Sequence, residues 1–420
     1  MAVAETTPIA AATNGGEGDG DKMGFAFVGS DQRIHAFLTT TSAAYSAGEE
    51  EGFAWQTADV LSLEQSADPS MAALPFPRPG TTPRSDGPVT TYWGWSASEN
   101  GNIDFYVAYL DTSSHVQCAG MYFPDNLELI PGGAPSPDKQ YLAADLTQRT
   151  GAPPAAPWSG ITSYNWQLEN SQHIVYVGTD GNIWELYYLG NPASDGLPLW
   201  QSNNLSERTG LVGPLAPKRE GPLAATMFEL EQTEHVVYIA GDNTIRELYF
   251  YNGSWGSNNL TEAASGPAPA AGTALVTYAC NYQDTLHVFY VDEAGHLDEL
   301  YWKAGAWYST LSLDNLRGKP PAAGSDLAGY SSESDNVHHI IYTSSENEII
   351  EVYYTGGTWN YTLLVGAPSP IAPLSETGPI AGYAFSEGPN REHIFYVDNS
   401  SRVHQKYRGA SSWNDGITPG

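Results

Sequence analysis

The sequence has few basic residues and no long apolar run. Of its 420 residues, 17 are Lys or Arg and 48 are Asp or Glu, so the formal net charge is −31. Proteins that bind nucleic acids neutralise phosphates with Lys and Arg, and anionic membrane surfaces attract the same side chains. No apolar run approaches the ~20 residues that a membrane-spanning helix needs. We therefore expect no nucleic-acid partner and no insertion into a membrane.

Cysteine is also scarce. Cys118 and Cys280 are the only two, too few for a disulfide framework or for a zinc site built on cysteine pairs. Two buried thiols are expected rather than a disulfide. The first residues lack the basic and apolar segments of a signal peptide. The protein is thus expected to be soluble, and either cytoplasmic and made without such a peptide or secreted and beginning at its mature end.

Aromatic residues and turn formers are abundant, and they recur with a period. Aromatics make up 12% of the chain, with 43 Gly and 29 Pro. Five segments begin with an alternating run that starts at a histidine, continue through a turn rich in Gly, Asp, Asn and Ser, and end in a second run. The five histidines are His173, His235, His287, His339 and His393. Their spacing of roughly 50 to 60 residues is typical of a propeller or a solenoid.

Each repeat supplies four strands, the usual number in a propeller blade. A strand of small residues, such as Ile380-Ala381-Gly382-Tyr383, precedes each hairpin, and a tryptophan follows it. Two weaker copies precede the five. The sequence therefore predicts an all-β, single-domain β-propeller over residues 1–420, most simply with seven blades of four antiparallel strands and with six blades as the alternative. The expected blades span about 5–75, 86–155, 158–215, 219–270, 273–322, 325–375 and 378–420.

Four of the repeats place a glutamate twelve residues after the histidine. The pairs are His173 with Glu185, His235 with Glu247, His287 with Glu299, and His339 with Glu351. In the last repeat Gln405 takes the place of the acid after His393, and in the first two the pair is replaced by Gly24 with Ala36 and by Tyr106 with Cys118. A separation of twelve across a tight hairpin makes the two residues near neighbours on adjacent strands.

Two interpretations of these pairs remain open. A buried His–Glu pair could brace each blade. Alternatively, the pair could bind a ligand at each blade junction, because a carboxylate accepts hydrogen bonds from sugar hydroxyls, an imidazole donates or accepts, and a tryptophan face covers the apolar side of a pyranose.

The pattern resembles the fungal fucose-specific lectin family of β-propellers. That family repeats an Arg, then Ile-x-Glu twelve residues later, then an aromatic residue and a Trp, and its fucose pockets combine residues from two adjacent blades. Here His stands at each position of the family's Arg. The resemblance spans about residues 158–420 clearly and 1–157 faintly; seven-bladed bacterial relatives that bind fucose and methylated sugars are a second resemblance. It implies these ligand-binding residues: His173, Glu185, Tyr188, Trp200, His235, Glu247, Trp255, His287, Glu299, Trp302, Trp307, His339, Glu351, Tyr354, Trp359, His393 and Trp413.

The function expected from these features is that of a multivalent lectin with glycans or glycoconjugates as partners. Fucose-like or methylated sugars would bind in pockets between blades, where repeated weak sites give avidity. The alternatives are a propeller enzyme with one small-molecule pocket and a protein-interaction propeller whose His–Glu pairs are structural. We predict no catalytic residue, no metal ligand and no cofactor, and the sequence leaves open whether the protein is a monomer or a dimer.

Overall fold

The computed structural model describes most of the chain. The described residues are 9–13, 22–28, 34–40, 56–59, 82–84, 88–95, 103–121, 141–166, 169, 171–192, 198–316, 318–332, 335–366, 378–384, 392–398, 400–408 and 413–415.

The described strands form seven four-stranded antiparallel sheets, and in each sheet four consecutive strands pair in chain order. We number these sheets as blades 1 to 7. The strands of blades 1 to 3 are β1 (Ala10–Thr13), β2 (Lys22–Val28), β3 (Ile34–Thr40) and β4 (Gln56–Asp59); β5 (Val89–Trp95), β6 (Ile103–Leu110), β7 (Val116–Met121) and β8 (Tyr141–Asp145); β9 (Ile161–Trp166), β10 (Ser171–Val177), β11 (Ile183–Pro192) and β12 (Pro198–Asn204). Those of blades 4 to 7 are β13 (Leu223–Phe228), β14 (Thr233–Ile239), β15 (Ile245–Tyr251) and β16 (Ser254–Asn259); β17 (Val276–Cys280), β18 (Thr285–Val291), β19 (Leu297–Lys303) and β20 (Ala306–Thr310); β21 (Leu327–Ser332), β22 (Val337–Thr343), β23 (Ile349–Thr355) and β24 (Thr358–Val365); β25 (Ile380–Ala384), β26 (Glu392–Val397), β27 (Val403–Arg408) and β28 (Trp413–Asp415).

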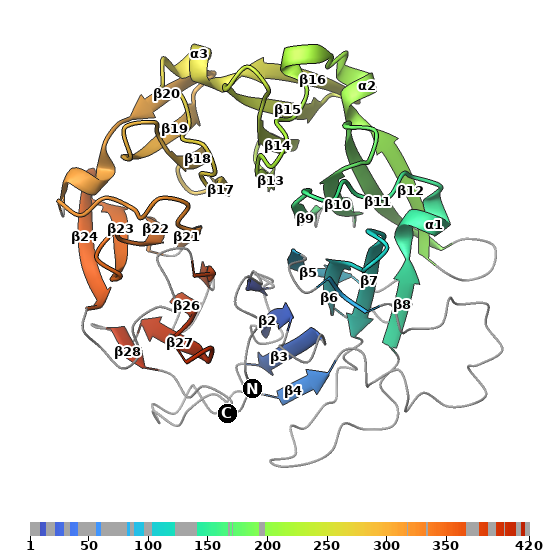
Figure 1. The fold of residues 1–420 in the computed structure, drawn as a ribbon, viewed down its shortest axis with the longest axis horizontal. Helices are drawn as coiled ribbons and strands as arrows, with labels where there is room; N and C mark the ends of the chain where they lie inside the picture. The colour runs from blue at the N-terminus through green and yellow to red at the C-terminus, as the bar shows by residue number, and fades with distance from the viewer. Residues whose placement is uncertain are drawn as a thin grey trace.

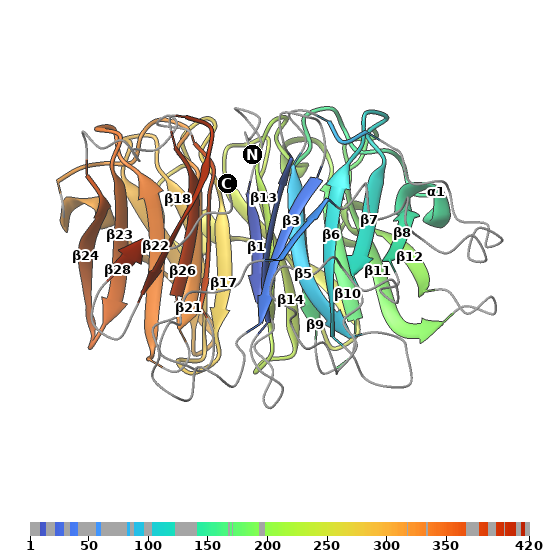
Figure 2. The ribbon, with the colours of Figure 1, turned by 90° about the horizontal axis from the view of Figure 1, so that it is seen from below.

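The sheets are arranged around a common axis, which confirms the predicted all-β propeller with four-stranded blades (Figure 1). The first strand of each blade lies innermost and contacts the first strand of the next, from β1 through β5, β9, β13, β17 and β21 to β25, which returns to β1. Figure 2 shows that the strands run along the axis of the ring. Small residues such as Gly382 in β25 suit this crowded position: a Cβ there would lie 2.8 Å from the Tyr330 ring of the preceding blade.

Blades 3 to 7 each have a buried tyrosine three residues after the blade's histidine. In blades 3 to 6 this tyrosine is 0% exposed, and its hydroxyl donates to a backbone carbonyl of the loop leading into the blade, over 2.7 to 3.0 Å. The four tyrosines are Tyr176, Tyr238, Tyr290 and Tyr342. An isolated β-bridge ties the same loop to the end of the second strand in each of these blades. The hydroxyl is thereby satisfied inside an apolar layer, where an unpaired one would be costly.

Short helices follow the outer strand of three blades. They are α1 (Leu146–Thr150), α2 (Leu205–Thr209) and α3 (Leu260–Ala264). Each begins at a side chain that caps a backbone N–H: Asp145, Asn204 and Asn259. The leucine that opens each helix is 0% exposed and belongs to an apolar cluster between two neighbouring blades. The helices therefore cover the outer ends of these clusters.

The apolar core lies between blades rather than within one compact centre. Seven clusters of buried side chains each join residues of neighbouring sheets. The last of these junctions closes the ring between blades 7 and 1, where Phe25 stacks on Phe395 with ring centroids 4.2 Å apart. Among the described strands no hydrogen-bonded pair crosses between these two sheets, so side-chain packing closes this part of the ring.

Among the described residues, no helix is long and apolar enough to cross a membrane.

Candidate functional site

The predicted His–Glu pairs form in all four blades. The Nδ1 atom of each histidine lies 2.6 to 2.8 Å from Oε1 of the glutamate twelve residues on. All eight side chains are buried; the histidines are 3%, 7%, 5% and 0% exposed in blades 3 to 6, and the glutamates 1% to 3%. In blade 7 the Nε2 atom of Gln405 lies 2.8 Å from Nδ1 of His393. The pairing is diagonal across the hairpin, since the residue directly opposite Glu185 is Val175.

The second imidazole nitrogen is also occupied in three of the blades. The Nε2 atoms of His173, His235 and His287 lie 2.6 to 2.8 Å from the hydroxyls of Ser171, Thr233 and Thr285. The imidazole rings of blades 3, 5, 6 and 7 stack on a tyrosine of the innermost strand, with centroids 4.6 to 5.3 Å apart. The histidines are therefore held within their own blades, and they orient the glutamates.

The tryptophans lie across the blade junction from these pairs. Each Trp sits on the fourth strand. Trp200 and Trp307 pack, with the aromatic residue opposite each, against the preceding blade, whereas the residue opposite Trp413 is Arg408. Trp413 of blade 7 donates from Nε1 to Oε2 of Glu351 in blade 6, over 3.0 Å. Trp255, Trp307 and Trp359 pack in the same way against the clusters of blades 3, 4 and 5. Between blades 6 and 7 the structure thus brings together the His–Glu pair of one blade and the tryptophan of the next.

The aromatic partners of these tryptophans include three further predicted site residues. Tyr188 lies opposite Trp200, Trp302 opposite Trp307, and Tyr354 opposite Trp359. The ring centroids in these three pairs are 5.3 to 6.1 Å apart. Phe250 and Trp255 make the same contact in blade 4, at 5.6 Å.

A further position faces each pair, and the sequence analysis missed it. It is the residue immediately before each histidine, which strand alternation turns toward the preceding blade. In blades 3 to 7 it is Gln172, Glu234, Leu286, His338 and Glu392. All five are at most 5% exposed. The side chain that the next blade turns toward each His–Glu pair therefore differs from one junction to the next.

The junction between blades 3 and 4 gathers two carboxyl groups. Tyr164 donates to Oε2 of Glu234 over 2.7 Å and to Oε1 of Glu185 over 3.2 Å, and Nδ1 of His173 lies 3.7 Å from the same Glu234 oxygen. Burial raises the pKa of Glu234 to about 7. Burial alone would raise the pKa of Glu185 as well, but the hydrogen bond and charge of His173 hold it below its ordinary value.

The junctions on either side of blade 6 are occupied differently. The ring of His338 lies 4.3 Å from that of His287, and burial together with the neighbouring histidines lowers the pKa of His338 to about 2. At the next junction Glu392 lies 3.4 Å from Nε2 of His339 and 3.1 Å from the Arg408 guanidinium. Burial raises the pKa of Glu392 despite these two groups.

In blades 3 and 4 an asparagine of the fourth strand donates a hydrogen bond to the glutamate of the pair. Asn203 donates to Oε2 of Glu185 over 2.9 Å, and Asn258 donates to Oε2 of Glu247 over 3.0 Å. The equivalent positions in blades 5 and 6 are Thr310 and Thr362, which lie opposite Glu299 and Glu351. The sequence signal was an asparagine pair before the short helix, which is absent from those two blades.

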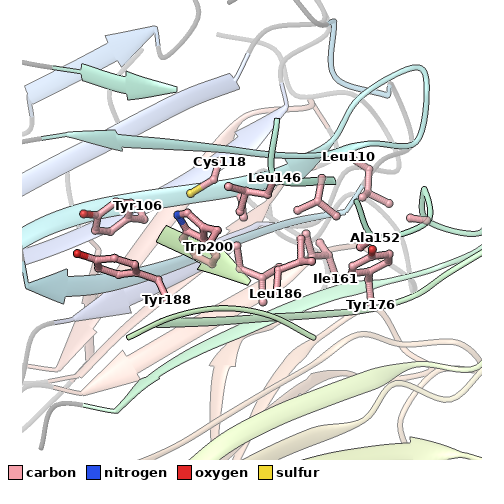
Figure 3. Close-up of a cluster of buried hydrophobic side chains, with 14 of the residues drawn as sticks. Tyr106, Leu110, Cys118, Leu146, Ala152, Ile161, Tyr176, Leu186, Tyr188 and Trp200 are labelled. Atoms are coloured by element: carbon pink, nitrogen blue, oxygen red, sulfur yellow. The ribbon is translucent and has the colours of Figure 1, made fainter. Parts of the chain in front are cut away.

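The junction between blades 2 and 3 lacks the pair (Figure 3). Strand register places Tyr106 and Cys118 where other blades have His and Glu, as predicted. These two residues lie in one cluster with Tyr188 and Trp200. The Cys118 thiol lies 3.4 Å from the Tyr92 hydroxyl, and burial raises its pKa to about 12. Neither cysteine forms a disulfide, and both are buried, as expected.

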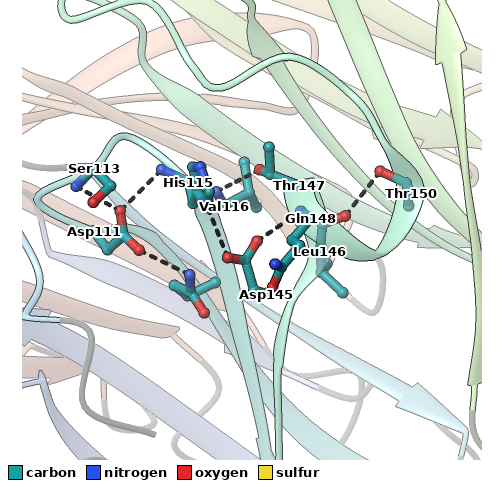
Figure 4. Close-up of polar contacts among 10 residues, drawn as sticks. Asp111, Ser113, His115, Val116, Asp145, Leu146, Thr147, Gln148 and Thr150 are labelled. Carbon is teal, nitrogen blue, oxygen red and sulfur yellow. Dashed lines mark hydrogen bonds and ion pairs between the residues drawn. The ribbon is translucent and has the colours of Figure 1, made fainter. Parts of the chain in front are cut away.

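Three groups of described residues could in principle hold a cation: Asp111 with His115 and Asp145, and the two triads formed by a His–Glu pair and Glu234 or Glu392. In the first group every carboxylate oxygen already accepts a hydrogen bond (Figure 4). Asp111 closes the hairpin turn of blade 2, and Asp145 caps α1. These residues therefore shape a turn and a helix start.

Comparisons with known proteins match this architecture. The sequence profile described as the fungal fucose-specific lectin family matches residues 159–375 and 215–419. No curated protein matches.

Among solved structures, a lectin from Burkholderia pseudomallei is similar with a TM-score of 0.60 at 13% identity, over 100% of both chains. The fucose-specific lectin of Aleuria aurantia is similar with a TM-score of 0.52 at 14% identity, over 98% of this chain and 95% of that one. Another structure of the Aleuria protein is described as a six-bladed propeller. At these identities the likeness concerns the fold.

Proposed function

This chain belongs to the fungal fucose-specific lectin family, and from that membership we propose that it is a lectin that binds fucose-like or methylated sugars at the junctions between its blades. The observation that carries the proposal is the meeting of a buried carboxylate with a tryptophan of the next blade, as in the 3.0 Å contact between Glu351 and Trp413. Carboxylates accept hydrogen bonds from sugar hydroxyls, and indole faces cover the C–H face of a pyranose.

The repeated histidine cannot supply the contacts that an arginine would supply at the same position. Arginine presents a rigid fork of donors to a ligand. Both nitrogens of His235 already have partners in the blade, Glu247 and Thr233. In this proposal the histidine is a positioning residue, and the glutamate Oε2, the neighbouring asparagine and the aromatic faces contact the sugar.

Four junctions carry the complete His–Glu–Trp set and are the candidate pockets: those between blades 3 and 4, 4 and 5, 5 and 6, and 6 and 7. A second candidate function is a protein-interaction propeller. The burial of all four pairs favours it, because pairs at most 7% exposed also serve as braces.

A glycan array probed with the intact protein separates the two functions. We expect binding to fucosylated or O-methylated glycans, followed by a saturable calorimetric titration with α-methyl-L-fucoside. Silence across the array at high protein concentration, together with no heat on titration, would refute the lectin proposal and leave the pairs as braces.

A further inference from the structure

His338, in β22 of blade 6, is a buried imidazole whose two ring nitrogens have no hydrogen-bond partner among the described residues. It faces the pair of His287 and Glu299 in blade 5, at the position that immediately precedes each blade histidine. We infer that His338 is a displaceable plug of the junction between blades 5 and 6, and that a sugar hydroxyl reaches Glu299 when the imidazole swings out. The inference rests on the proposed function, and it adds a residue that controls access to one pocket.

Aromatic rings surround the imidazole of His338. Its ring centroid lies 4.3 Å from that of His287, 5.9 Å from that of Tyr354 and 6.0 Å from that of Tyr278, and the residue is 1% exposed. A neutral imidazole has one N–H donor and one acceptor nitrogen. Burying both without partners is costly, because water would satisfy each of them. Ring packing alone therefore holds His338 in this position, against the cost of removing its nitrogens from water.

The side chains at the same position of the other three junctions are held more firmly. Glu234 accepts from the Tyr164 hydroxyl over 2.7 Å, and Glu392 accepts from a guanidinium over 3.1 Å. Leu286 is 0% exposed and has no polar side-chain atom to satisfy. Displacing either acid would break a buried hydrogen bond, and displacing the leucine would expose apolar surface. His338 loses no hydrogen bond on leaving, and both of its nitrogens gain access to water.

The carboxylate beside this plug, Glu299, has one oxygen without a donor. In the other three pairs an asparagine or a tryptophan donates to the Oε2 atom of the glutamate. In blade 5 the corresponding residue of the fourth strand is Thr310, and among the described residues only His287 bonds the Glu299 carboxylate, at Oε1. The Oε2 atom is also not one of the fully buried atoms that lack a partner. A hydroxyl that enters this junction can therefore donate to it.

The tryptophan of blade 6 leaves the same carboxylate free. Trp359 stands edge-on to Phe289 of blade 5, with ring centroids 6.0 Å apart and ring planes at 81°. Phe289 lies directly opposite Glu299 on the neighbouring strand, so the indole is near the pair, yet no hydrogen bond between described residues joins it to Glu299. At the next junction Trp413 donates to Glu351 over 3.0 Å. The contact that closes the junction between blades 6 and 7 is thus unmade between blades 5 and 6.

The groups around His338 define what can take its place. They are the Glu299 carboxylate, the rings of Tyr354 and Trp359, and the buried Tyr278 hydroxyl, which also has no hydrogen-bond partner in the described part of the chain. Aromatic rings cover the C–H face of a pyranose, and a carboxylate needs a donor. A free hydroxyl can donate to Glu299, whereas the ether oxygen of an O-methyl group cannot. This junction should therefore take a sugar whose hydroxyl at that point is unmethylated.

Calorimetric titration of the full chain with α-methyl-L-fucoside tests the plug. His338→Ala removes it and should strengthen binding at one site per chain about 10-fold or more, because the open conformation no longer has to be populated first. His338→Leu copies the residue of blade 5 and should weaken binding at that site about 10- to 100-fold, because a buried leucine would have to be exposed. The same variant should raise the midpoint of thermal unfolding by about 1 to 3 °C, since no unsatisfied nitrogen stays buried. His296→Leu, at the opposite end of blade 5, is the matched control and should leave binding unchanged.

Carbon–proton NMR spectra of the imidazole rings give a second measurement. In the buried position, burial together with His287, His339 and Lys303 lowers the pKa of His338 to about 2, so its ring should not titrate between pH 5 and pH 8. In the presence of saturating sugar the ring should reach solvent and titrate near the ordinary histidine value of about 6.5. The signal that His338→Leu removes identifies the ring.

The outcomes distinguish this inference from the proposed function. Binding that is unchanged in both His338 variants, or a His338 ring that still does not titrate in the saturated protein, would overturn the plug and leave the lectin function standing. No binding by either the wild-type chain or His338→Ala would overturn the lectin function itself. Binding by His338→Ala alone would support both. If the alanine variant does not fold, as judged by circular dichroism, His338→Leu and the ring titration decide.

Discussion

Replacing Glu234 with Gln should stabilise the protein at alkaline pH and leave it nearly unchanged in mild acid. The carboxyl lies buried between Tyr164, His173 and Glu185, with the charge of Glu169 also acting on it. Burial raises its pKa from 4.5 to about 7. A carboxyl whose pKa is higher in the folded state contributes stability that is fully present below about pH 4.5 and is lost as the pH rises through about 7.

The size of the effect follows from that shift. Each unit of pKa difference corresponds to about 1.4 kcal/mol, so ionising Glu234 costs the folded state up to about 3 kcal/mol. Glutamine cannot ionise, and its amide oxygen can still accept from the Tyr164 hydroxyl. The free energy of unfolding of the variant minus that of the wild type should therefore increase by about 1 to 3 kcal/mol between pH 5 and pH 8.

Urea unfolding followed by tryptophan fluorescence at both pH values measures this difference. Glu262→Gln is the matched control, because Glu262 is an exposed acid on α3. The control should show a pH-independent difference close to zero. An equal difference at pH 5 and pH 8 for Glu234→Gln would show that this carboxyl does not titrate within the junction, and the reasoning would fail.

Three other substitutions test the packing and the braces. Phe395→Leu, which removes the ring stacked on Phe25, should lower the free energy of unfolding by about 1 to 3 kcal/mol and speed hydrogen exchange in the first and last blades before the others. Glu299→Ala should cost about 3 kcal/mol, because buried His287 loses its partner, and thermal unfolding would show it. Tyr290→Phe should cost about 1 kcal/mol by urea unfolding, since the hydrogen bond to the Pro267 carbonyl is lost.

Two of these substitutions have a matched control. Phe289 holds the place in blade 5 that Phe395 holds in blade 7. Phe289→Leu should therefore cost a similar free energy without faster hydrogen exchange confined to the first and last blades. If both variants speed exchange selectively in those two blades, the stacking of Phe395 on Phe25 is not what closes the ring. Glu299→Gln should cost less than the alanine variant. An unchanged midpoint for Glu299→Ala would rule out the brace.

The fold was predictable because the repeat is clear in blades 3 to 7. In blades 3 to 6 the histidine and the glutamate recur twelve residues apart, and the paired distances of 2.6 to 2.8 Å confirm the hairpin register that this spacing implied. The buried state of both cysteines followed from the same apolar strands.

The residues that meet at each junction between blades could not be predicted as well from the sequence. Which tryptophan covers which glutamate depends on how the sheets pack around the ring, and no spacing within one repeat encodes the contact between Trp413 and Glu351. The signal at Glu234 was available, because alternation along a strand turns the residue before the histidine to the opposite face. The residue at this position varies from Glu to Leu to His between blades, so no repeated residue type marks it in the sequence.

In the described part of the ring, each blade is one uninterrupted stretch of chain, and no sheet borrows a strand from elsewhere in the sequence. A blade can therefore be duplicated or deleted as a single segment without breaking a hydrogen-bonded ladder. After such a change, only the angle between neighbouring sheets and the side chains at one junction between blades must readjust. A six-bladed propeller and a seven-bladed one can in this way be related by the gain or loss of one blade. The side chains at each new junction between blades can then change independently of the other junctions.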